Sequence, residues 1–124
     1  MNGFKCTIEY CSKELTAKEK VGIKDTTNAL RLDELTADNK KLVIAPAFYA
    51  VLDIENENSE SKNYKNYIIV DKDGNKYVTG SEAFYSSFAD IAADMGDEAY
   101  ELEIYRRESK NYKGKSFITC SIVM

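Results

Sequence analysis

Hydrophobic and polar residues alternate in several short stretches of the chain. Every second residue is apolar between residues 3 and 10, from Phe4 to Tyr10, which predicts a half-buried strand. A shorter alternation through Val21 and Ile23 predicts a second strand over residues 18–25. Residues 28–36 fit a short helix and another edge strand equally well, so both alternatives stay open.

The clearest local signal is the stretch YKNYIIVDKDGNKYVTG. Two runs rich in β-branched and aromatic residues flank Asp73 and Gly74, a pair that favours the positive φ angles of a tight hairpin turn. The predicted hairpin strands are residues 64–71 and 76–79. Just upstream, residues 48–57 predict a strand that begins shortly after the single proline.

The hydrophobic period then becomes helical in SEAFYSSFADIAADM. Phe84, Phe88 and Met95 fall on one face of the predicted helix. Ser81 is a typical N-cap residue, and Gly96 is well placed to end the helix.

Strand-like alternation returns over residues 100–107 and 115–123. In the last strand Ile118, Cys120 and Ile122 share one face. Phe117 lies on the opposite, more polar face, where an aromatic side chain suggests a binding surface.

These elements follow one another as strand, hairpin, helix, strand, turn and strand. A five-stranded barrel of the oligonucleotide-binding (OB) type places its helix between the third and fourth strands, as this order does. We therefore predict a mainly β fold, an OB-like barrel over residues 47–123. Residues 1–40 would be an N-terminal elaboration with extra strands, within a single domain of 124 residues. An α+β sheet with one packed helix is the competing topology.

Composition argues against an enzyme. The chain has no histidine, which excludes Ser-His-Asp and Cys-His chemistry, and no pair of carboxylates stands out as a general acid and base. Its three cysteines lack metal-binding spacing and fit a reducing compartment. We expect a non-enzymatic protein with no cofactor.

One stretch invites comparison with a calcium loop. Asp71, Asp73, Asn75 and Glu82 occupy the first, third, fifth and twelfth positions of an EF-hand loop. The sixth position, however, is Lys76 instead of glycine, and the preceding residues predict a strand instead of a helix. A hairpin turn before a capped helix explains the same residues, so we expect no metal site.

Lysines and tyrosines interleave in two similar segments, SKNYKNY at residues 61–67 and SKNYKGKSF at residues 109–117. Cations that follow phosphates and aromatic rings that stack on bases suit single-stranded nucleic acid. OB-folds bind oligonucleotides with strands two and three and with the loops after strands one and four, so both segments should line one groove. A polar turn in each segment is the alternative interpretation. The predicted binding residues are Lys62, Tyr64, Lys65, Tyr67, Tyr77, Tyr105, Arg107, Lys110, Tyr112, Lys113, Lys115 and Phe117.

The C-terminal two thirds of the chain, roughly residues 48–123, resemble a known family. The stretches YIIVDKDGNKYVTGSEAFYSSFADI and ELEIYRRESKNYKGKSFITCSIV are similar to small single-stranded-DNA-binding proteins encoded by phages and mobile elements of Gram-positive bacteria. The resemblance implies an OB-fold that coats and protects single strands during replication or recombination. It also implies that the basic and aromatic residues of the last hairpin contact the DNA.

We therefore expect sequence-tolerant binding of single-stranded DNA, with RNA, replication proteins and a second copy of the chain as further candidate partners. The N-terminus lacks a basic region followed by an apolar core, so we expect no signal peptide, no membrane association and a cytoplasmic location, in a bacterial host if a phage encodes the chain. The alternative function is a protein-interaction module, such as a phage-encoded inhibitor of a host enzyme. Its acidic residues 55–60 would then mimic nucleic acid.

Overall fold

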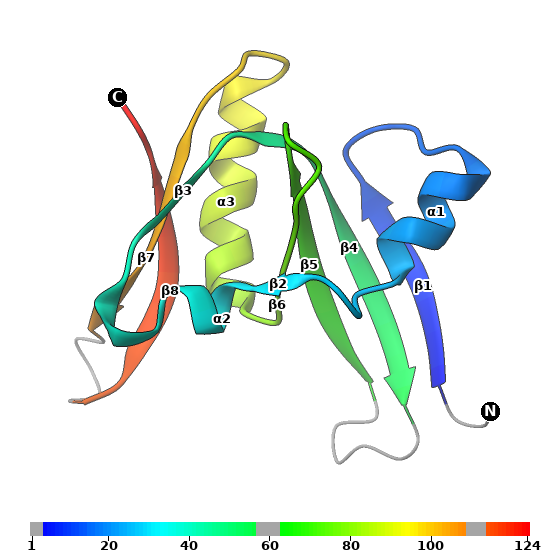
Figure 1. Ribbon diagram of the computed structural model, residues 1–124, viewed down its shortest axis with the longest axis horizontal. Coiled ribbons are helices and arrows are strands. Elements are labelled where there is room, and N and C mark those ends of the chain that lie inside the picture. The colour runs from blue at the N-terminus through cyan, green and yellow to red at the C-terminus, as the bar shows by residue number, and fades with distance from the viewer. Residues whose placement is uncertain (1–3, 57–62, 109–113) are drawn as a thin grey trace.

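The computed structural model describes residues 4–56, 63–108 and 114–124 (Figure 1). The elements in chain order are β1 (Phe4–Cys11), α1 (Ala17–Lys24), β2 (Leu30–Arg31), α2 (Leu32–Leu35), the 3₁₀ turn η1 (Ala37–Asn39), β3 (Leu42–Ile44), β4 (Pro46–Asn56), β5 (Asn63–Asp71), β6 (Lys76–Thr79), α3 (Glu82–Met95), β7 (Leu102–Glu108) and β8 (Ser116–Ile122).

The strands form two open sheets. The five-stranded sheet has the order β1-β4-β5-β6-β2, with β2 parallel to β6 and the other pairs antiparallel. The three-stranded sheet has the order β3-β7-β8 and is antiparallel. A single residue, Ala45, separates β3 from β4, so the chain passes directly from one sheet to the other at this point.

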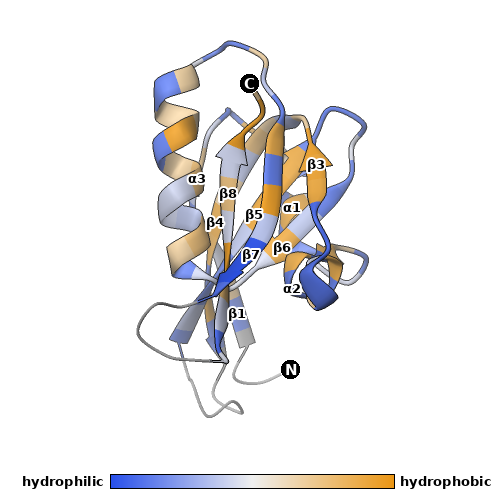
Figure 2. Ribbon diagram, turned by 90° about the vertical axis from the view of Figure 1, so that its left-hand side faces the viewer, coloured by the Kyte–Doolittle hydropathy of each residue, from blue (hydrophilic) through white to orange (hydrophobic). Residues whose placement is uncertain are grey.

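The prediction of an OB-like barrel is wrong, because the described strands do not close into one. Strand β6 pairs with β5 along one edge and with β2 along the other. The short strand β2, from the N-terminal region, therefore occupies the edge of β6 that the last strand would need for closure. Strand β8 instead ends the three-stranded sheet, with α3 packed beside it (Figure 2).

The N-terminal region also differs from the prediction. Residues 18–25 do not form a strand, because α1 begins after a capping box in which the Thr16 hydroxyl accepts from the Glu19 amide and the Glu19 carboxylate accepts from the Thr16 amide. Residues 28–36, left open between helix and strand, contain both: the two-residue strand β2 and the one-turn helix α2. The strand predicted for residues 3–10 is confirmed as β1.

The hairpin predicted around Asp73 and Gly74 is confirmed. Strands β5 and β6 pair in antiparallel register from Tyr67 opposite Thr79 to Val70 opposite Lys76. Gly74 has a φ of 87°, the left-handed conformation that the turn requires. The strand predicted before the hairpin is likewise confirmed as β4, and the two strands predicted after the helix are confirmed as β7 and β8.

Helix α3 also forms as predicted. The Ser81 hydroxyl accepts a hydrogen bond from the Phe84 amide at 3.1 Å, and Gly96, with a φ of 60°, ends the helix. At 14 residues it is the longest of the described helices, and none of them is long and apolar enough to cross a membrane.

Two clusters of buried side chains hold the sheets and helices together. The first lies under α3, where Phe84 and Phe88 pack against both the five-stranded sheet, through Ile69, and the three-stranded sheet, through Leu102 and Ile104. The second lies on the other face of the five-stranded sheet. There Ile23 of α1 covers a set of apolar residues on β4, β5 and β6, which are Ala50, Leu52, Ile54, Ile68 and Val78. Helix α3 therefore joins the two sheets, whereas α1 covers only one.

Candidate nucleic-acid interface

The three-stranded sheet turns one face to the core and the other to solvent. Its inner face carries the buried residues Ile44, Leu102, Ile104, Ile118 and Cys120. The residues that alternate with them form what we call the outer face, flanked by Lys41 and Lys115: Val43, Glu103, Tyr105, Arg107, Phe117, Thr119 and Ser121. With the two flanking lysines, this face has three cations (Lys41, Arg107, Lys115) and one acid (Glu103), which gives it a net charge of +2.

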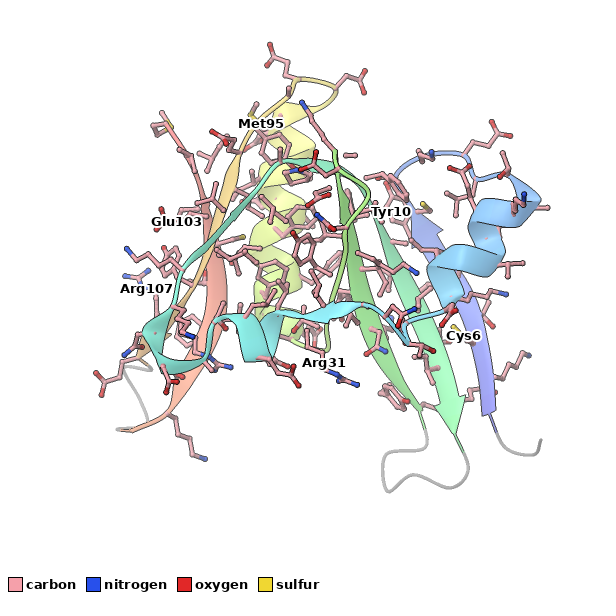
Figure 3. All side chains as sticks on the ribbon, viewed as in Figure 1. Cys6, Tyr10, Arg31, Met95, Glu103 and Arg107 are labelled. Carbon is pink, nitrogen blue, oxygen red and sulfur yellow. The ribbon has the colours of Figure 1, made fainter. Side chains whose placement is uncertain are left out.

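Phe117 is the exposed aromatic residue of the outer face. It keeps 40% of its surface exposed, whereas its neighbour Ile118 keeps 3%, as the alternation of the strand predicts. Arg107 lies directly opposite Phe117 in the β7–β8 pair and is also exposed. Facing residues of neighbouring strands have Cβ atoms about 4.5–5.5 Å apart, so a cation and an aromatic ring lie side by side here. In Figure 3 Arg107 and Glu103 point away from α3.

Tyr105 is fixed in place next to this pair. Its hydroxyl and that of Ser121 are 2.7 Å apart and share a hydrogen bond. The Lys41 ammonium lies 5.9 Å from the centre of the Tyr105 ring and 3.5 Å from a carboxylate oxygen of Glu103. These contacts hold the ring against the strand, with its cation partner on the same face of the sheet.

The two adjacent arginines of β7 have different environments. Arg106 points to the other side of the strand, where Nη2 donates to the Asp33 carbonyl at 3.0 Å and Nη1 donates to the Ser116 hydroxyl at 3.3 Å. Arg106 thus holds α2 against the three-stranded sheet. Arg107 is the arginine that the structure leaves exposed on the outer face.

Three of the residues predicted from the first lysine–tyrosine segment, Tyr64, Lys65 and Tyr67, lie in the five-stranded sheet, on β5. Tyr64 packs toward the cluster under α1, whereas Tyr67 points to the other face, where it is only 7% exposed and stacks on Tyr85 with ring centres 4.4 Å apart. Lys65 binds the carboxylate of Glu9 at 2.9 Å. Alternation along the strand therefore divides this segment between two faces of one sheet.

Tyr77 is buried in the core beside the hairpin turn. Its hydroxyl donates to Asp71 Oδ2 at 2.9 Å. Burial and this hydrogen bond raise the pKa of Tyr77 to about 12. The ring is 6% exposed, so the structure assigns it a packing role.

The Asp71 carboxylate organises the turn that resembled a calcium loop. Its Oδ1 accepts from the amides of Asp73 and Asn75, and its Oδ2 accepts from the Asn75 side chain as well as from Tyr77. Hydrogen bonding within the turn thus satisfies both oxygens. In the part of the chain that the structure describes, no group of three or more acidic or cysteine side chains is placed to hold a metal ion.

The structure brings together Tyr105, Arg107, Lys115 and Phe117 at one end of the three-stranded sheet. It does not bring them together with Tyr64, Lys65, Tyr67 and Tyr77, which belong to the other sheet. Of the remaining predicted residues, Lys62, Lys110, Tyr112 and Lys113 lie outside the described residues. Gly114 of the second segment has a φ of 80°, a left-handed conformation that favours glycine.

Two residues of the outer face were missed at the level of sequence. Lys41 and Val43 alternate with the apolar Leu42 and Ile44, but a three-residue strand is too short to give a clear period. Val43 is 51% exposed and lies opposite Glu103, so it extends the apolar part of this face beyond β7.

Comparison of the chain with protein-family models, with curated proteins and with solved structures gives no match.

Proposed function

We propose that the chain binds single-stranded nucleic acid without strong sequence preference, on the outer face of the three-stranded sheet. The observation that carries this proposal is the pair of exposed side chains Arg107 and Phe117, facing each other on adjacent strands. An arginine is placed to contact a phosphate, and a ring to stack on a base, within one nucleotide's reach of each other.

The surroundings of this pair support the same function. Thr119 and Ser121 offer hydroxyl groups along β8, and Lys41 and Lys115 add positive charge at either side. A run of acidic side chains lies elsewhere, on α3 and the segment after it, at Glu82, Asp90, Asp94, Asp97 and Glu98. A polyanion therefore meets a locally positive surface at the outer face, although the chain as a whole has a net charge of −4.

In this proposal the protein is not an enzyme. It coats and protects single-stranded DNA in the bacterial cytoplasm during replication or recombination of phage DNA, the role that the sequence resemblance implies. RNA is a second candidate ligand, because stacking and phosphate contacts do not by themselves distinguish the two nucleic acids. Self-association and contact with replication proteins belong to the same proposal.

The test is a titration of the protein into fluorescently labelled poly-dT, in which fluorescence anisotropy measures binding at two salt concentrations. We expect binding that weakens as salt rises and that is stronger for single-stranded DNA than for duplex of equal length. An RNA strand of the same length measures whether the protein prefers DNA or RNA. Absence of binding to poly-dT at low salt would contradict the proposal.

A further inference from the structure

A groove lined by tyrosines runs between α3 and the five-stranded sheet, away from the outer face. One hollow, of about 360 Å³, lies between β1, β5 and the start of α3 and is lined by Tyr10, Tyr67 and Tyr85. A second, of about 620 Å³, lies toward the end of α3 and is lined by Tyr10, Tyr49 and Tyr100 among others. Tyr10 borders both hollows, so they adjoin.

The rings of this groove form a connected series. Tyr10 lies 5.7 Å from Tyr49, and Tyr49 lies 6.2 Å from Tyr85, measured between ring centres. Tyr85 in turn stacks on Tyr67. Tyr10 is 49% exposed, at the C-terminal end of β1 (Figure 3), whereas Tyr67 is buried. The groove therefore has a rigid aromatic floor and one ring that is open to a ligand.

The charges around these rings are mainly negative. Four carboxylates line the two hollows, from Glu9, Glu82, Asp97 and Glu98, against two lysines, Lys65 and Lys72, so the lining has a net charge of −2. Lys65 is already bound to Glu9. Burial raises the pKa of the Tyr67 hydroxyl, and the nearby carboxylate of Glu82 raises it further.

Helix α3 adds to this negative potential at its C-terminal end only. Its last turn borders the larger hollow and contains no basic residue, although a cation there would be favourable. Its first turn borders the smaller hollow, where the carboxylate of Glu82 offsets the positive end of the helix dipole. Aromatic faces combined with carboxylates attract a cation, above all a guanidinium group, which also stacks on rings. Nucleic acid, in contrast, would be repelled from this groove.

We propose that the groove between β1 and α3 is a docking site for a basic segment of a partner protein, with an arginine side chain placed against Tyr10 and near Glu82. The two adjoining hollows suit an extended segment better than a single small cation, because they follow one another on either side of Tyr10. This site is opposite in charge to the outer face of the three-stranded sheet, so both can be occupied at the same time.

The probe is a fluorescein-labelled peptide of sequence GRGRGRG, measured by fluorescence anisotropy. Its control is the same peptide with citrulline in place of arginine, which keeps the shape and removes the charge. We expect the arginine peptide to bind and the citrulline peptide to bind at least about fivefold more weakly. Equal binding of both peptides, or no binding of either, would overturn the proposal.

Variants of the chain locate the site. Tyr10→Ala and Glu82→Gln should each weaken the arginine peptide about two- to fivefold, and Tyr10→Phe, which keeps the ring, should bind like the wild type. Asp38→Asn on η1 removes the same charge as Glu82→Gln outside the groove and should have no effect. Thermal melting monitors the fold of each variant. An equal loss in Asp38→Asn, or full binding by Tyr10→Ala, would show that only net charge matters and that the groove is not the site.

Variants at the two sites, each measured with one ligand at a time, separate this inference from the proposed function. Phe117→Leu should weaken poly-dT binding and leave the affinity for the arginine peptide unchanged, whereas Tyr10→Ala should weaken only the peptide, since the two ligands use different faces. Loss of peptide binding in Phe117→Leu would mean that the peptide binds the outer face, and would overturn the docking site while leaving nucleic-acid binding intact.

Discussion

Arg107 and Phe117 face each other across the β7–β8 pair, and both side chains are exposed on the side of the sheet opposite the core. A buried pair would stabilise the fold, whereas an exposed phenylalanine beside a single cation contributes little to stability. The arrangement therefore points to ligand binding, and the contributions of Arg107 and Phe117 to that binding can be measured separately.

The ring of Phe117 should contribute by stacking. Phe117→Leu keeps an apolar side chain but loses the ring. We expect it to weaken poly-dT binding by about 1–3 kcal/mol. Phe117→Tyr keeps the ring and should bind as the wild type does. Anisotropy titrations at one salt concentration measure both. If leucine served as well as tyrosine, the ring would not stack on a base.

The charge of Arg107 should appear in the salt dependence. Removing one phosphate contact reduces the slope of log K against log salt concentration by about 0.7 for a single strand. Arg107→Ala should therefore bind more weakly at low salt and show this shallower slope. The matched control is Arg31→Ala, an exposed arginine on β2 in the other sheet (Figure 3), which should keep the wild-type slope. Equal slopes for the two variants would contradict a specific role for Arg107.

Phe84 joins the two sheets through α3 and is fully buried. We expect Phe84→Ala to lower the free energy of unfolding by about 3–5 kcal/mol, because it removes a large buried side chain and leaves a cavity. Val21→Ala, at a position 71% exposed on α1, should change it by less than about 0.5 kcal/mol. Urea denaturation measures both. A loss below about 1 kcal/mol for Phe84→Ala would contradict the packing of α3 between the sheets.

Asp71 should make stability depend on pH. Burial alone would raise the pKa of its carboxyl, but the hydrogen bonds from Asn75, Tyr77 and Asp73 outweigh burial, so the pKa lies below its usual value of 3.8. The unfolded state then binds a proton more readily than the folded state. The stabilisation is therefore complete above about pH 5 and is lost as the pH falls below about 4, through the folded pKa.

Asp71→Asn tests this relationship. The variant should lose about 1–3 kcal/mol of stability at pH 7, because an amide cannot accept all four hydrogen bonds. The difference between wild type and variant should shrink as the pH falls below 4. Urea denaturation at pH 7 and pH 3 measures it, and a difference that stays constant over this range would argue against an ionised Asp71 in the turn.

The parts of the fold that follow from local chemistry could be predicted from the sequence. Asp73 and Gly74 specify the hairpin, while Ser81 and Gly96 mark the ends of α3, because each acts on its own neighbours in the chain. The exposed position of Phe117 follows from the same period-two rule that buries Ile118.

The parts that depend on distant pairing could not. Barrel closure is prevented by the contact of Leu30 and Arg31 with Tyr77 and Val78, and a two-residue strand leaves no recognisable period. In α1 the capping box of Thr16 and Glu19 outweighs the strand-like spacing of Val21 and Ile23.

The candidate site shows the same limit. The two lysine–tyrosine segments look alike as sequence, but residues 63–67 of the first belong to β5 and residues 116–117 of the second belong to β8, in different sheets with different neighbours. The Tyr77 ring is buried with its hydroxyl group donating a hydrogen bond to Asp71, and the Tyr67 ring is buried under Tyr85. The groove around Tyr10 depends on where α3 lies across the five-stranded sheet, which no local signal predicts.

The position of β2 along β6 has a consequence for aggregation. An unpaired strand edge is a template on which strands of other molecules can add. Residues 30 and 31 cover that edge of β6, so the N-terminal region protects the sheet from intermolecular pairing. A chain shortened to residues 41–124 would expose this edge, the edge of β4 that β1 covers, and the apolar surface under α1. We expect it to aggregate in size-exclusion chromatography, whereas the chain of residues 1–124 does not.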